Sequence, residues 1–145
     1  MNVEQIGLVQ ASFAQVTLIA DQAADLFYAR LFQLDPTLRG MFKNDMAEQR
    51  QKLIAMLTFT VNNLTQPEEL LPAIQALGRR HVGYGVKNRH YETLGAALLW
   101  TFEKALGEEY TPEVKAAWAA VYSLLATTMQ QAAAEGLSNA TDSGQ

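Results

Sequence analysis

The sequence predicts an all-α fold, because apolar residues recur at helical spacing between clear start and stop signals and no segment alternates with a two-residue period. The 145 residues are 49% hydrophobic and 18% charged, a balance typical of one globular domain. The last stretch, residues 136–145, is small and polar. We therefore expect a folded domain over residues 1–135 and a flexible polar tail over residues 136–145.

The first third of the chain contains three patterns that predict the start of a helix. Asn2 and Gln5 have the spacing of a capping box, and Asp21 can begin a second helix. Asp35 followed by Pro36 is a cap with proline at the first helical position, which predicts a short helical turn. The two longer helices carry one-sided apolar stripes, formed by Ile6, Val9, Phe13 and Val16 and by Ala24, Phe27, Leu31 and Leu34.

Four later helices are predicted from the residues at their N-termini. These are Asp45 with Glu48 as a second capping-box pair, Gln66 before Pro67, Asn88, and Thr111 before Pro112. Gly83 and Gly85 are expected to end the helix that begins after Gln66.

Charge and composition exclude several classes of function. A net charge of −4 disfavours nucleic acid and anionic membranes as partners, and the absence of cysteine rules out disulfides, thiolate metal sites and a cysteine nucleophile. The first residues do not resemble a signal peptide, and no apolar run approaches the ~20 residues that a spanning helix needs. We expect a soluble, cytoplasmic protein.

Only two histidines are present, and His81 is the more informative. It follows Leu70, Ile74 and Leu77 at helical spacing, so its imidazole lies in line with an apolar face. Two interpretations remain open on this basis, a core histidine bound to a backbone carbonyl and an axial ligand of haem. His90, which has polar neighbours, is expected to be exposed. No phosphate-binding glycine loop or hydrolase motif is present.

Several segments, in order, resemble the bacterial single-domain haemoglobins and the globin domain of flavohaemoglobins. The segment LGRRHVGYGV, residues 77–86, resembles their proximal-histidine region, and the similarity extends over roughly residues 5–130. The other matching segments are LFYARLF at residues 26–32, Met41-Phe42, His90-Tyr91 and AAWAAVY at residues 116–122. The resemblance implies a globin fold whose helices pack around a haem pocket.

The resemblance also implies the roles of individual residues around haem b. His81 matches the proximal iron ligand, and its second ring nitrogen is expected to donate to the carbonyl of Leu77. Tyr28 and Gln49 match the distal tyrosine and glutamine that hydrogen-bond the gas ligand. The other residues implied to line the pocket are Phe42, Leu53, Leu77, Val86 and Tyr91.

One position departs from the pattern of these families. They resemble peroxidases on the proximal side, because a glutamate bonds the proximal imidazole through the tyrosine. Counting from Tyr122 by the family spacing reaches Ala133, and Glu135 lies about 200° further round a straight helix. Either the last helix is shifted or the carboxylate is missing, and peroxidase-like activation is in doubt.

The expected function is tight, reversible binding of O2, and of NO or CO, with slow release of O2. An enzyme that oxidises NO to nitrate with an external reductase is the main alternative, since the same pocket serves both. A haemless globin-like interaction module is disfavoured because Tyr28, Gln49 and His81 occur together. A phycobilin-type pigment protein is disfavoured because covalent attachment of that pigment needs cysteine.

Overall fold

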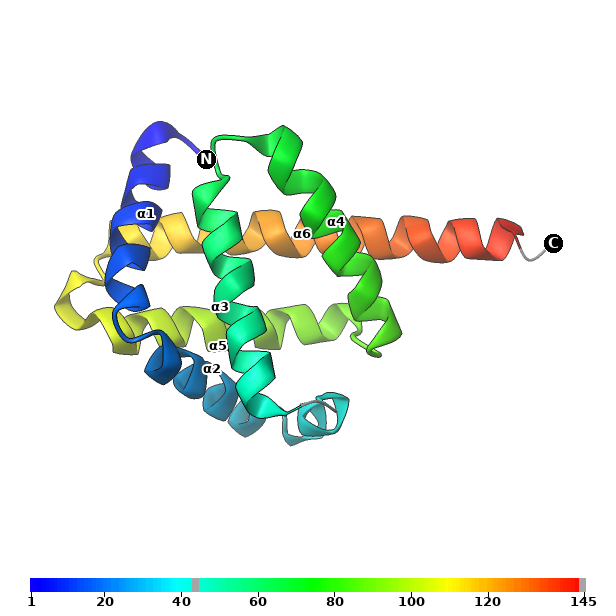
Figure 1. Cartoon of the computed structure of the whole chain (residues 1–145), viewed down its shortest axis with the longest axis horizontal. Helices are drawn as coiled ribbons and strands as arrows, with labels where there is room; N and C mark the ends of the chain where they lie inside the picture. The colour runs from blue at the N-terminus through cyan, green and yellow to red at the C-terminus, as the bar shows by residue number, and fades with distance from the viewer. Residues whose placement is uncertain (43–44, 144–145) are drawn as a thin grey trace.

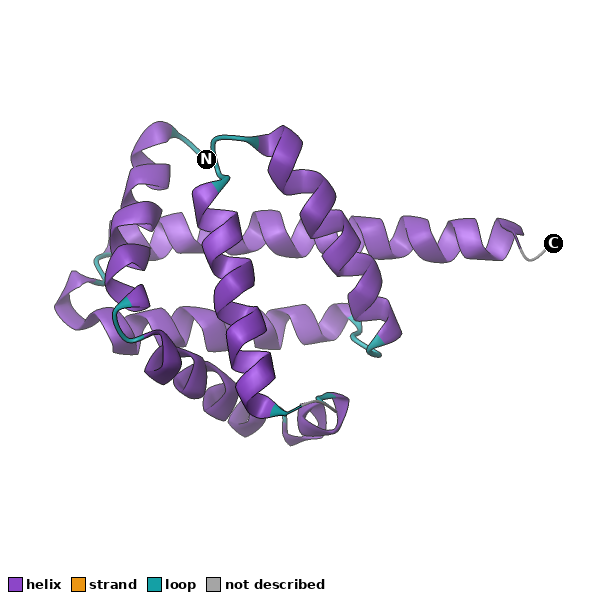
Figure 2. Ribbon diagram, viewed as in Figure 1, coloured by secondary structure: helices purple, strands orange, loops and turns teal. Residues whose placement is uncertain are grey.

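This computed structural model describes residues 1–42 and 45–143, with side chains as far as residue 135, and within these ranges it contains no strand (Figure 2). The all-α prediction is confirmed. The elements are α1 (Val3–Thr17), α2 (Ala20–Leu34), the 3₁₀ helix η1 (Pro36–Met41), α3 (Met46–Asn62), α4 (Pro67–Gly83), α5 (Asn88–Leu106), the 3₁₀ helix η2 (Gly107–Glu109) and α6 (Pro112–Ser143).

Most predicted helix starts are confirmed by their capping hydrogen bonds. Asn2 and Gln5 form the reciprocal capping box, and the carboxylate of Asp35 accepts from the Thr37 N–H at 3.1 Å. The carboxylate of Asp45 likewise accepts from the backbone N–H of Ala47 at 3.1 Å. These bonds satisfy N–H groups that have no partner inside the helix.

Three details of the predicted starts are wrong. Glu48 does not complete a capping box with Asp45 and instead pairs with Lys52 one turn later, at 3.4 Å. Helix α2 begins at Ala20, one residue before the expected Asp21. Asn88 is the first residue of α5 rather than its cap, because the capping position belongs to Lys87.

Figure 1 shows that helices α3 and α4 cross over helices α5 and α6. Helices α3 and α4 lie in front of α5 and α6 in this view, and α4 packs more extensively against α6 than any other pair of elements packs. Helix α2 packs against α5, and α1 contacts both α6 and α5. Among the described residues, α3 and α4 make few contacts with each other although they are consecutive in the chain.

The core is centred on Trp118 of α6. Its side chain is fully buried and stacks on Phe102 of α5 with 4.0 Å between ring centroids. The indole N–H donates to the hydroxyl of Ser12 in α1 at 2.9 Å, so the polar atom is satisfied where it is buried. This contact joins the first and last helices.

The crossing of α4 over α6 depends on Gly78. A Cβ atom added at this position would lie 2.5 Å from the carbonyl oxygen of Met129 and 2.6 Å from its Cα, which is too close for any side chain. Because the obstacle is backbone, it cannot move aside as a flexible side chain would. Gly78 therefore sets how closely α4 approaches α6, and His81 lies three residues further along the same helix.

Helix α6 continues to Ser143, past the expected domain boundary at residue 135. The mobility of residues 136–145 stays a prediction. None of the helices in the described ranges combines the length and the apolar character needed to cross a membrane.

Candidate functional site

His81 is held in one orientation by its own helix. Its Nδ1 atom lies 2.9 Å from the carbonyl oxygen of Leu77, one turn earlier in α4. A carbonyl only accepts, so this contact requires the proton on Nδ1 and leaves a lone pair on Nε2. Burial lowers the pKa of His81 and nearby Arg80 lowers it further, while the bond to Leu77 raises it. The imidazole is therefore neutral at pH 7, in the tautomer that can bind a metal through Nε2.

The chain after His81 turns sharply at two glycines. Helix α4 ends at Gly83, and Gly85 has φ +87°, a left-handed conformation that glycine adopts without strain. The Val86 N–H donates back to the His81 carbonyl at 3.1 Å. The ring of Tyr84 lies beside the His81 ring, with 5.7 Å between centroids. The predicted stop is confirmed, and the turn fixes the segment that follows the histidine.

Tyr28, Gln49 and Phe42 come together from α2, α3 and the residue after η1. The Tyr28 hydroxyl donates to the backbone carbonyl of Gln49 at 3.2 Å, and the Tyr28 and Phe42 rings meet edge to face at 5.4 Å. Burial raises the pKa of Tyr28 to about 12, although Arg50 opposes the shift. Tyr28 is thus a protonated donor at neutral pH. Its partner is the main chain of Gln49 rather than the side-chain amide, which is half-buried.

The apolar residues expected around the site share an intermediate degree of burial. They pack against the core on one side and keep part of their surface open, and they are Phe42, Leu53, Leu77 and Val86. They come from the residue after η1, from α3, from α4 and from the α4–α5 turn. Leu77 and Val86 are joined to His81 by hydrogen bonds and place partly open apolar residues near the neutral imidazole. Such surroundings suit a flat, largely apolar group with a metal at its centre.

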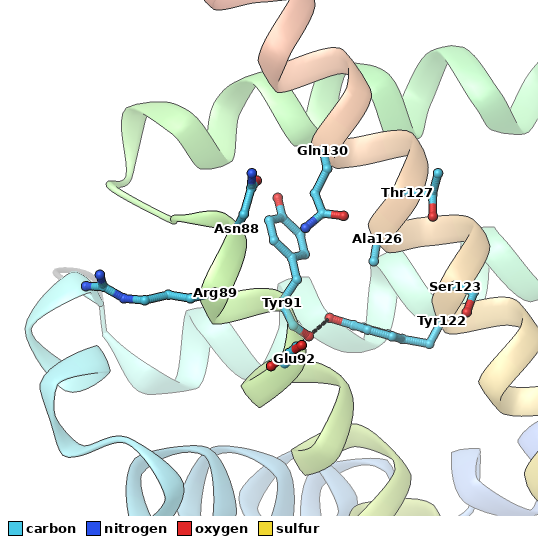
Figure 3. A pocket seen from close by; sticks show the side chains of 9 residues that line it. All are labelled: Asn88, Arg89, Tyr91, Glu92, Tyr122, Ser123, Ala126, Thr127 and Gln130. Carbon is cyan, nitrogen blue, oxygen red and sulfur yellow. Dashed lines mark hydrogen bonds between the residues drawn. The ribbon is translucent and has the colours of Figure 1, made fainter.

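Tyr91 lines a cleft of about 560 Å³ between α5 and α6 (Figure 3). Its side chain is only 6% exposed, and its carbonyl accepts a hydrogen bond from the Tyr122 hydroxyl. The cleft lining does not include His81; it consists of Asn88, Arg89, Tyr91, Glu92, Tyr122, Ser123, Ala126, Thr127 and Gln130. The surface of the cleft is mixed, with both polar and apolar parts.

The missing proximal carboxylate is explained by the geometry of α6. This element is one continuous helix through Ala133 and Glu135, so these two residues lie on different faces of the helix. Glu135 is exposed, and burial alone raises the pKa of Tyr91. Among the side chains that the structure describes, none of the carboxylates contributes to the pKa shift of Tyr91.

His90 is buried rather than exposed, which corrects the prediction. It is 2% exposed, and its Nδ1 accepts from the backbone N–H of Lys87 at 2.8 Å, as the third residue of α5 does in a capping box. Burial lowers the pKa of His90. The polar neighbours in sequence were misleading, but the three-residue spacing from the cap was a usable signal. Sequence reasoning also missed Gly78, Tyr84 and the contact of Tyr122 with Tyr91.

A family model for globins matches residues 25–129. The chain belongs to the globin family. This globin is 35% identical over 103 residues to the flavohemoprotein of Bordetella parapertussis and 32% identical over 106 residues to that of Chromobacterium violaceum. The matches cover 69% and 71% of this chain but 26% of each relative, so the globin spans about a quarter of their length.

Solved structures show the same fold. An engineered carbene transferase, made from a proposed nitric oxide dioxygenase of Rhodothermus marinus, superposes with a TM-score of 0.87 at 23% identity, covering 97% of this globin and 99% of that chain. A hexacoordinated haem protein from an anhydrobiotic tardigrade superposes with a TM-score of 0.83 at 16% identity, covering 92% and 95%. Membership of the globin family implies that this chain binds haem, and the residues around His81 fit that group.

Proposed function

We propose that this globin holds haem b through Nε2 of His81 and reversibly binds O2, and also NO or CO, on the opposite side of the haem. The partly buried imidazole of His81, in a chain of the globin family, carries the proposal. A hydrogen bond joins its Nδ1 to the Leu77 carbonyl. It selects the neutral tautomer with a free Nε2 and holds the ring at a fixed angle to α4, as histidine ligands of metals require.

When bound, haem supplies an iron that takes up O2, NO or CO in its ferrous form. The chain's own residues control the polarity of the space beside that iron. Tyr28 is protonated and can turn its O–H from the Gln49 carbonyl to a gas ligand with partial negative charge. We assign the amide of Gln49 as the second donor. A net hydrogen bond is worth ~0.5–1.5 kcal/mol, so each donor changes affinity by up to about tenfold.

The partly open apolar side chains complete the pocket in this proposal. Phe42, Leu53, Leu77 and Val86 would cover the macrocycle and exclude water, because their packing against the core already holds them in place. Tyr91 would contact the proximal side from α5. We place the protein in the cytoplasm, where intracellular reductants keep the iron ferrous.

Oxidation of NO to nitrate with an external reductase is a second candidate. It is favoured by the similarity to flavohemoproteins and by the neighbouring structure from Rhodothermus marinus, described as a proposed nitric oxide dioxygenase. In this candidate an external reductase would provide the electrons, and the region that matches this globin makes up 26% of the flavohemoproteins.

Absorption spectra test the primary proposal. The protein is purified with haem supplied, and spectra are recorded in the ferric state, after reduction with dithionite, and after addition of CO. A Soret band that shifts on adding CO is expected, since one coordination position is open. Failure to take up haem would reject the proposal and favour a haemless interaction module. Turnover of NO with a supplied reductase then distinguishes the dioxygenase from a storage or delivery role.

A further inference from the structure

The positive charge of this globin is unevenly distributed along the chain. Of its 11 basic residues, four lie between positions 79 and 89, and none of the 15 acidic residues does. We call these four residues, Arg79, Arg80, Lys87 and Arg89, the proximal basic patch. The overall net charge of −4 hides the patch, because the rest of the chain is more acidic than that value.

All four side chains of the proximal basic patch are exposed. The ion pairs found among the described side chains lie elsewhere, between Arg50 and Asp25 and between Lys52 and Glu48. The pKa of Asp35 is lowered mainly by the hydroxyl of Thr37, and the charges of His90 and Arg89 lower it only weakly. Within the part of the chain whose side chains are described, the patch therefore has no ion pair with a carboxylate.

Helix electrostatics explain part of the patch but not all of it. Arg80 lies in the last turn of α4, where the partial negative charge of the helix end favours a cation. Lys87 caps the N-terminus of α5 and Arg89 is in its first turn, where the partial positive charge of the helix disfavours cations. A role outside the local structure would account for these two residues.

In the sequence, the residues of the patch lie on both sides of the segment that carries the proposed iron ligand. Arg80 precedes His81 directly, and Lys87 and Arg89 follow the turn whose Val86 N–H bonds to the His81 carbonyl. In Figure 1 this region is where the green end of α4 meets the start of α5, at the opposite end of the molecule from the junction of α5 and α6.

We propose that the proximal basic patch docks an acidic electron-donor protein beside the haem edge. The inference rests on the proposed function, because it presupposes haem on His81. Charges of one sign around a site steer an oppositely charged partner to it and raise the association rate. An extended polyanion, such as a nucleic acid or an anionic bilayer, would also meet the acidic remainder of the surface. A compact acidic protein can contact the patch alone.

Stopped-flow reduction of the ferric, haem-loaded protein tests the inference, with reduced flavodoxin as the acidic donor. The second-order rate constant should fall steeply between about 0.01 M and about 1 M salt, as the Debye length shortens from ~30 Å to ~3 Å. In the double variant Lys87→Glu/Arg89→Glu, the rate at low salt should fall by about tenfold or more. Neither residue is among those proposed to hold haem.

The matched control is Lys104→Glu/Lys115→Glu, which changes the net charge equally at exposed positions, in the last turn of α5 and near the start of α6. It should retain most of the wild-type rate, and photoreduced lumiflavin, a small donor, should reduce all three proteins at similar rates. Equal loss in both double variants would overturn the inference, since net charge rather than the patch would then govern the rate.

Two further results separate the explanations. If the Soret band and CO shift are intact but the flavodoxin rate is unchanged in Lys87→Glu/Arg89→Glu, docking at the patch is rejected and haem binding stands. Binding to phosphatidylglycerol vesicles that depends on Lys87 and Arg89, without an effect on flavodoxin, would replace the protein partner with a membrane. The neutral variant Lys87→Gln/Arg89→Gln should unfold at or above the wild-type temperature. A clear decrease in the unfolding temperature would show that these two charges stabilise the fold, and would overturn the docking role.

Discussion

The imidazole of His81 is tied to the carbonyl of Leu77 at 2.9 Å, so the orientation of the proposed iron ligand is determined within one turn of α4. The alternative of a core histidine bound to a backbone carbonyl predicted the same contact. What favours the ligand is that the ring is only partly buried and that the chain is a globin.

Replacing His81 with alanine should abolish stable retention of haem. The measurement is the rate of haem transfer to an excess of apomyoglobin, followed in the Soret region. His90→Ala is an unsuitable control, because it would also remove the acceptor for the Lys87 N–H. His90→Gln keeps a side-chain acceptor at that position and should retain haem nearly as well as the wild type. Equal loss in His81→Ala and His90→Gln would reject His81 as the ligand.

Replacing Tyr28 with phenylalanine should accelerate dissociation of O2 by up to about tenfold, because one net hydrogen bond to the ligand is removed. Flash photolysis or stopped-flow mixing with CO measures the rate. Tyr110→Phe is a suitable comparison, since it removes a hydroxyl from a half-buried tyrosine after η2 that is not assigned to the pocket. A rate unchanged by Tyr28→Phe would show that this hydroxyl remains on the Gln49 carbonyl when the gas is bound.

Replacing Gly78 with alanine should destabilise the protein by about 1–3 kcal/mol, the usual cost of overpacking. The added methyl group would meet the backbone of Met129 at 2.5 Å, and α4 would have to move away from α6. Chemical denaturation monitored by circular dichroism measures the change. Gly7→Ala should have the opposite sign, by roughly 0.5–1 kcal/mol, because a Cβ at this helical position meets no other atom within 4 Å. Similar effects at both positions would contradict the close crossing.

Stability should decrease as the pH falls below about 6.5, the ordinary pKa of histidine. Burial lowers the pKa of His90 and of His81 in the folded protein, so the unfolded chain binds more protons in this range and unfolding becomes easier. Thermal unfolding at about pH 7.5 and about pH 5.5 measures the difference. His90→Gln should show a smaller decrease in Tm than the wild type, and an equal decrease would remove His90 from the explanation.

Features encoded in a few neighbouring residues could be predicted from the sequence. The cap at Asn2, the turn at Asp35 and the glycine stop after His81 depend on local backbone chemistry, and each is confirmed. The bond from His81 to Leu77 is local too, since it joins residues one helical turn apart.

Features that depend on distant parts of the chain could not be predicted in this way. The burial of His90 arises from tertiary packing, whereas its polar sequence neighbours suggested exposure. Gly78 appeared to be an ordinary small residue in a helix, because the Met129 backbone that it contacts belongs to α6. The Tyr28 hydroxyl bonds the main chain of Gln49 rather than its amide, and the distal roles of both residues stay predictions.

The dependence of α4 on α6 has a consequence for the order of events during synthesis. Helix α4 emerges from the ribosome well before α6, yet its largest packing surface is on α6, and the buried bond from Trp118 to Ser12 joins the last helix to the first. The nascent chain therefore has His81 early but lacks the support that positions it. We expect haem capture to be completed only after translation has delivered the final helix.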